Sequence, residues 1–119
     1  MFETVLLPMD ANPQALDTAV KALELVQSHN SRLVLLELLD LAPDPPLLDR
    51  IQARIDQSGV TCQRLECGGE PVTGILDVAD ELNVDVIVMG TGGVSLNSDD
   101  GSTAARVIEL APCPVLVVP

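Results

Sequence analysis

The stretch Asp85-Val86-Ile87-Val88-Met89-Gly90 decides the fold. Val84 to Met89, apolar except for Asp85, has the length of a strand that is buried on both faces. A polar, glycine-rich segment follows it, from Gly90 to Gly101. A second run of this kind, Thr4 to Leu7, stands near the start of the chain and stops at Pro8. Strands that are apolar on both faces are typical of parallel sheets covered by helices.

Amphipathic segments separate these runs. Asn12-Pro13 predicts a helix start, with proline at the first helical position, and apolar residues at helical spacing continue to about His29. Further helices are expected around Leu48–Ile55, from Gly68-Gly69-Glu70-Pro71 to Leu82 and around Ala105–Ala111, and further strands over residues 33–39, 60–67 and 114–118. The strand over 60–67 alternates most and is expected at a sheet edge.

The resulting order, βαβαβαβαβ, predicts an α/β domain over residues 1–119, with a five-stranded parallel sheet, right-handed crossovers and helices on both faces. In such Rossmann-like sheets, ligands bind beyond the carboxyl ends of the strands, where the strand order reverses. The first strand ends in Pro8-Met9-Asp10 and the fourth in Met89-Gly90-Thr91-Gly92-Gly93. These two ends are the candidate ligand site.

Composition excludes several classes of partner. The net charge is −12, from 18 acidic and 6 basic residues, and the chain has one Phe and no Tyr or Trp. Nucleic-acid binding needs a basic face, and single-strand binding needs aromatic stacking platforms. The same charge disfavours anionic membranes. We therefore expect no nucleic-acid partner and no membrane partner.

The cysteines and the single histidine indicate neither a metal site nor a catalytic group. No targeting segment is visible, so we expect a cytoplasmic protein in which Cys62, Cys67 and Cys113 are reduced thiols. With His29 as the only histidine, the ligands are too few for zinc. No nucleophile and base are placed to act together, so we expect no enzyme; slow hydrolysis of a nucleotide by a metal-bound water stays an open alternative.

The chain resembles the universal stress protein family, as a single-domain, UspA-like member. Four stretches carry the resemblance: Val5 to Asp10, Gly69-Glu70-Pro71, Asp85 to Gly90, and Ala111 to Val118. The resemblance implies the strand order 3-2-1-4-5, which places strands one and four side by side. It also implies a homodimer formed through the last strand, 114–118, and, in one branch of the family, ATP binding.

In that branch the nucleotide site resembles a Gly-x2-Gly-x9-Gly-[Ser/Thr] loop. The resemblance assigns Asp10 to the adenosine end and the Leu38 backbone to the base. The full candidate set is Pro8, Met9, Asp10, Leu38, Met89, Gly90, Gly92, Gly93, Gly101, Ser102 and Thr103. The chemistry agrees, because glycine amides approach phosphate closely and a helix N-terminus favours anions.

Two departures from the family pattern leave alternatives open. Seven residues, not nine, separate Gly93 from Gly101, and the loop carries Asp99-Asp100 without any Lys or Arg. These carboxylates can cap the following helix, hold Mg²⁺ or Mn²⁺ against phosphate, or weaken triphosphate binding by repulsion. Asp10 likewise can contact a ligand or accept bonds from turn amides.

Two functions follow from these observations. The first is a non-catalytic stress-response or signalling module that binds an adenine nucleotide (ATP, ADP or AMP) between strands one and four. The alternative is a nucleotide-independent, dimeric interaction module, which has a degenerate phosphate loop and an unknown protein partner.

Overall fold

The computed structural model describes residues 2–10, 12–41, 43–90 and 103–119. Five strands alternate with four α-helices, and one 3-10 turn follows the second strand. Their bounds are β1 Thr4–Met9, α1 Ala15–His29, β2 Arg32–Leu38, η1 Leu39–Leu41, α2 Pro45–Ser58, β3 Cys62–Cys67, α3 Pro71–Glu81, β4 Val86–Gly90, α4 Thr103–Leu110 and β5 Val115–Val118.

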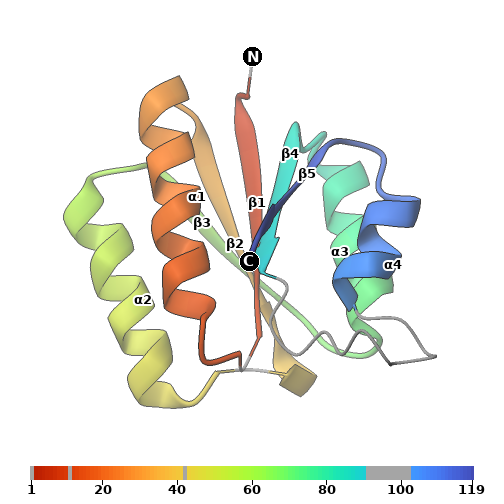
Figure 1. The fold of residues 1–119 in the computed structure, drawn as a ribbon, viewed down its shortest axis with the longest axis horizontal. Helices are drawn as coiled ribbons and strands as arrows, with labels where there is room; N and C mark the ends of the chain where they lie inside the picture. The colour runs from red at the N-terminus through yellow and green to blue at the C-terminus, as the bar shows by residue number, and fades with distance from the viewer. Residues whose placement is uncertain (1, 11, 42, 91–102) are drawn as a thin grey trace.

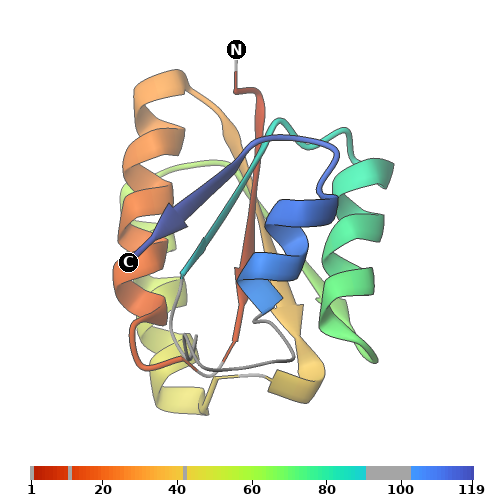
Figure 2. The same ribbon diagram turned by 45° about the vertical axis from the view of Figure 1, so that its right-hand side comes forward.

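All five strands are parallel and follow the order β3-β2-β1-β4-β5. Figures 1 and 2 show α1 and α2 on one face of the sheet and α3 and α4 on the other. The chain thus moves away from β1 in one direction for β2 and β3 and in the other for β4 and β5. The predicted fold class and strand order are confirmed, and the reversal lies between β1 and β4.

Each face of the sheet has its own apolar core. In β1, Val5, Leu7 and Met9 pack with α1 and α2, whereas Leu6 packs with α3 and α4. These four residues are at most 1% exposed. Burial on both faces is the reason that this strand is apolar without interruption.

Most predicted elements are present, and their bounds shift by one to three residues. The predicted strand over 60–67 starts at Cys62, and the one from Val84 starts at Val86. A shift of the same size occurs at α1, which starts at Ala15 rather than directly after Asn12. Asn12 still serves the helix start, because its carbonyl accepts a hydrogen bond from the amide of Ala15 at 2.9 Å.

The two edge strands differ in character. β3 lies at one edge, as its alternating pattern predicts, and exposes Gln63, Arg64 and Glu66. β5 lies at the opposite edge and is apolar, with the Leu116 side chain 43% exposed. Charged side chains protect an edge strand against pairing with other chains, so only the β3 edge has that protection.

Candidate functional site

A small cavity lies at the carboxyl ends of β1 and β4, where the strand order reverses. Its lining combines the ends of three strands with the first turns of two helices. The lining residues are Pro8, Met9, Asp10, Asn12, Ala15, Thr18, Leu38, Met89, Gly90 and Thr103. The fold therefore brings together seven of the eleven residues named from the sequence. The other four, Gly92, Gly93, Gly101 and Ser102, lie outside the described residues.

The Asp10 carboxylate forms one wall of this crevice and also makes a turn. Its Oδ1 accepts a hydrogen bond from the Asn12 amide at 3.1 Å. The Asn12 Oδ1 in turn accepts from the Gln14 amide at 2.9 Å. These bonds fix both side chains and use one oxygen of each. The turn role of Asp10 is therefore present, and within the described part of the chain no hydrogen bond engages its Oδ2.

Gly90 ends β4 against the first turns of α1. A Cβ placed on Gly90 would lie 2.8 Å from the Thr18 Oγ1 and 3.8 Å from the Asn12 Nδ2. Thr18 is 5% exposed, and its hydroxyl donates to the Gln14 carbonyl at 3.3 Å. A glycine is needed here because of this close approach, not because of a turn conformation.

Asn12, Ala15 and Thr18 line the crevice but were not among the residues predicted to do so. Periodicity predicted that α1 packs on the sheet, but not that its first turn reaches the end of β4. The spacing of Ala15 and Thr18, one turn apart, is an ordinary signal of a helix face turned toward a core. This spacing does not distinguish residues that line a ligand site from residues that only pack in a core.

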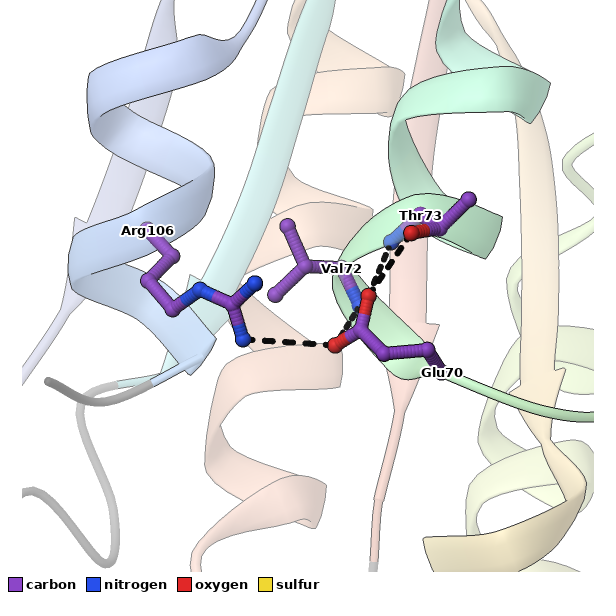
Figure 3. Close-up of polar contacts among 4 residues, drawn as sticks. All are labelled: Glu70, Val72, Thr73 and Arg106. Carbon is purple, nitrogen blue, oxygen red and sulfur yellow. Dashed lines mark hydrogen bonds and ion pairs between the residues drawn. The ribbon is translucent and has the colours of Figure 1, made fainter. Parts of the chain in front are cut away.

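Polar contacts link η1, the start of α3 and α4. Asp40 in η1 accepts the Gly69 amide at 3.0 Å. Glu70 caps α3: its Oε2 accepts from the amide and the hydroxyl of Thr73, each at 2.8 Å, and its Oε1 accepts from the Val72 amide at 3.2 Å. Arg106 reaches across from α4 to the Oε1 at 3.4 Å (Figure 3).

The groups around Glu70 favour its ionised form. The hydrogen bonds from the Thr73 amide and hydroxyl, followed by that from the Val72 amide and the charge of Arg106, lower the pKa of Glu70 below its usual value. The α3 dipole acts in the same direction, because a carboxylate at a helix N-terminus is favoured. Glu70 is therefore a fixed negative charge at neutral pH.

The cavity is small. The cavity volume is about 20 Å³, which is space for about one water molecule. The wall expected from residues 91–102 lies outside the described residues. Binding of a nucleotide therefore requires that all but a few of the ligand atoms lie outside this cavity.

The single histidine and the three cysteines are not among the residues that line the crevice. His29 ends α1 and stacks edge-on against Phe2, near the amino ends of the strands. Burial is the main reason that the pKa of each cysteine thiol is raised, which disfavours the reactive thiolate (Cys62, Cys67 and Cys113). Among the described residues, no three His, Cys, Asp or Glu side chains are grouped to hold a metal. The weak metal candidates Asp99 and Asp100 fall outside the described range.

A parallel sheet of this order, with an acidic residue after β1 and a glycine at the end of β4, defines an α/β protein with a crevice where the strand order reverses. Comparison with known proteins specifies the class further. Residues 47–119 match the model of the universal stress protein family. A universal stress protein of Synechocystis is 40% identical over 136 aligned positions, which cover 100% of this chain and 87% of the relative. A universal stress protein of Thermus aquaticus is 31% identical, with 99% of each chain covered.

Solved structures agree on the fold. A universal stress protein in complex with cAMP superposes with a TM-score of 0.83 at 23% identity, covering 98% of this chain and 97% of that one. The universal stress protein from Archaeoglobus fulgidus in complex with dAMP gives 0.73 at 22% identity, with full coverage of both chains. The chain belongs to the universal stress protein family.

Within the described residues, no helix is both long and apolar enough to cross a bilayer.

Proposed function

We propose that this protein is a non-catalytic module that binds an adenine nucleotide in the crevice between β1 and β4. One observation carries the proposal: the reversal point of the sheet brings Asp10, Leu38, Gly90 and Thr103 to one cavity. Ligands of open parallel sheets bind at this position. The cAMP and dAMP complexes of two structural relatives support an adenine nucleotide as the ligand class.

The residues around the crevice have complementary tasks in this proposal. Asp10 presents the acceptor Oδ2 for a ribose hydroxyl or for the exocyclic amine of the base. The start of α4 at Thr103 offers backbone amides and a hydroxyl to phosphate. Gly90 lets the ligand approach the backbone at the end of β4. A bridging Mg²⁺ or Mn²⁺ at Asp99 or Asp100 is part of the same proposal.

Calorimetric titration with ATP, ADP and AMP, each with and without Mg²⁺ or Mn²⁺, tests the proposal. Asp10→Ala should weaken binding by about tenfold, the scale of one lost charge-assisted hydrogen bond. Asp49→Ala is the matched control, because it removes the same charge from the exposed side of α2, away from the cavity lining. If no nucleotide binds more tightly than the millimolar range under any condition, the proposal is wrong.

The apolar edge supports a second part of the proposal, a homodimer through β5. A groove of about 390 Å³ runs between α1 and β5, lined by Leu25, Leu116, Val118 and Pro119 among others. Antiparallel pairing of two β5 strands would bury this edge across a two-fold axis. The same surface would serve the alternative function, a nucleotide-independent interaction module. A cytoplasmic location stays a prediction, and the three free thiols are compatible with it.

Sedimentation at tens of micromolar, a range set by common dimer affinities, tests the dimer. Leu116→Lys should give a monomer, because it places a charge on the paired edge. Leu39→Lys is the control, since Leu39 is similarly exposed (47% against 43%) but lies in η1 after β2. A wild-type monomer at these concentrations would contradict the dimer and leave nucleotide binding unaffected.

A further inference from the structure

We propose that Arg106 is the cation that balances the phosphate charge of the bound nucleotide, and that it leaves Glu70 to do so. The inference deepens the proposed function and rests on it. It follows from the scarcity of positive charge near the crevice, from the position of Arg106 on α4, and from the way in which Glu70 holds it.

The part of the chain after Leu65 has a single basic residue. Between residue 65 and the last residue, Arg106 is the one Lys or Arg in the sequence. The described carboxylates at this end of the sheet include Asp10, Asp40 and Glu70. A nucleotide adds negative charge to a region that is already acidic, and each uncompensated contact at close range costs affinity. Arg106 is therefore the residue with the charge that a phosphate group requires.

Its position on α4 is suitable for that contact. Arg106 lies three residues after Thr103, the α4 residue that lines the crevice. Residues three apart are neighbours on one side of a helix. Side chains on a helix also lean toward its N-terminus, so a released Arg106 side chain can reach the turn that contains Thr103.

Glu70 holds Arg106 in a way that permits exchange. The pair is half-exposed on both sides, with 49% of Arg106 and 46% of Glu70 accessible, and the nitrogen–oxygen distance is 3.4 Å. Exposed ion pairs of this kind contribute little to stability. Glu70 keeps three other hydrogen bonds, to the amides of Val72 and Thr73 and to the Thr73 hydroxyl, after Arg106 has left (Figure 3). The cap of α3 thus does not depend on the ion pair.

The exchange replaces a single weak contact with a stronger one. The guanidinium meets Glu70 through one nitrogen. A phosphate offers several oxygens, which match the two-pronged geometry of arginine and its fixed charge. The gain grows with phosphate number, so Arg106 distinguishes phosphorylated ligands from the nucleoside.

Titration of ATP, AMP and adenosine at one fixed, low salt concentration tests the exchange. Arg106→Gln should weaken ATP binding by about tenfold, or about 1.4 kcal/mol, and change adenosine binding by less than about twofold. Arg106→Lys should recover part of the loss. Arg54→Gln is the matched control, because Arg54 is an exposed cation on α2; it should change neither affinity.

Glu70→Gln gives the decisive comparison, because the two possible roles predict opposite signs. If Arg106 leaves Glu70 to bind phosphate, removing the competing carboxylate strengthens ATP binding by a fewfold. If the pair only clamps α4 against α3, Glu70→Gln weakens ATP binding as Arg106→Gln does. Weaker ATP binding by Glu70→Gln would overturn the role of Arg106 as a phosphate ligand. The same holds if Arg106→Gln weakens ATP and adenosine binding equally, or if it weakens neither. A wild-type protein that binds no ligand of the series overturns the proposed function itself.

Discussion

Replacing Gly90 with alanine should destabilise the protein through one contact that can be isolated. The added Cβ would lie 2.8 Å from the Thr18 Oγ1. The preferred separation of heavy atoms is about 3.5–4.0 Å, so one of the two groups has to move by roughly 1 Å. The φ angle of Gly90 is not positive, and alanine therefore adds no backbone strain of its own.

Thr18 cannot move without loss. Its side chain is buried, branched at Cβ, and bonded to the Gln14 carbonyl at 3.3 Å. A shift off its rotamer costs about 0.5–1.5 kcal/mol, and overpacking of a filled site commonly costs about 1–3 kcal/mol. We expect Gly90→Ala to lower the free energy of unfolding by about 1–3 kcal/mol, which corresponds to a fall in Tm of several degrees.

Urea unfolding of a double-mutant cycle measures this contact. Thr18→Ala removes the hydroxyl that the new Cβ would meet, so the double variant should be more stable than the sum of the two single changes predicts, by about 1 kcal/mol or more. Gly68→Ala is the control, because a Cβ there meets nothing within 4 Å and the φ angle of Gly68 is not positive. If the effects of Gly90→Ala and Thr18→Ala simply add, the close approach is not what requires glycine.

Three further predictions concern charge and protonation. Arg64→Ala should lower stability by about 1–2 kcal/mol, because Arg64 pairs at 3.0 Å with Glu37, whose side chain is only 11% exposed; urea unfolding beside Arg54→Ala checks it. The lowered pKa of Glu70 means that its contribution is present above the unfolded value and is lost as pH falls through the folded value, so the stability of the wild type should fall more steeply than that of Glu70→Gln below about pH 4.5. The raised thiol pKa values predict slow labelling of the native protein by a disulfide reagent at pH 8 and faster labelling after unfolding (Cys62, Cys67 and Cys113).

Each of these results has a clear opposite. An equal loss of stability in the Arg64 and Arg54 variants would mean that the removal of any positive charge has this effect, and that the pair with Glu37 does not cause it. Parallel acid profiles for the wild type and the Glu70 variant would mean that the cap contributes nothing through ionisation. Labelling of the native thiols at the rate of the unfolded chain would contradict their burial.

The layers of the fold could be predicted because buried positions are apolar in the sequence. Val86–Met89 are buried on both faces of the sheet, and the sequence there is apolar without interruption. Alternation in β3 likewise predicted its edge position. Strand order is different, since several orders satisfy the same pattern of strands and helices; here the order came from the resemblance to a family.

Seven of the ten residues that line the crevice could be predicted, because most of them stand at the ends of strands. Asp10 directly follows β1 and Gly90 ends β4, so the rule for ligand sites in parallel sheets identifies them. Thr18 belongs to the site because α1 passes close to the end of β4, and that approach depends on packing. Arg106 and Glu70 are 36 residues apart, and no periodicity relates them.

The contrast between the two sheet edges limits how far association can proceed. A molecule with two adhesive edges could add copies at both ends and grow into a filament. Here one margin, β5, is apolar, while the other, β3, presents Arg64 and Glu66 to solvent. After two β5 margins have met, each outer margin of the assembly is a charged one. In the proposed dimer, polymer growth would therefore end at the first step, and substitutions that make β3 apolar would remove this stop.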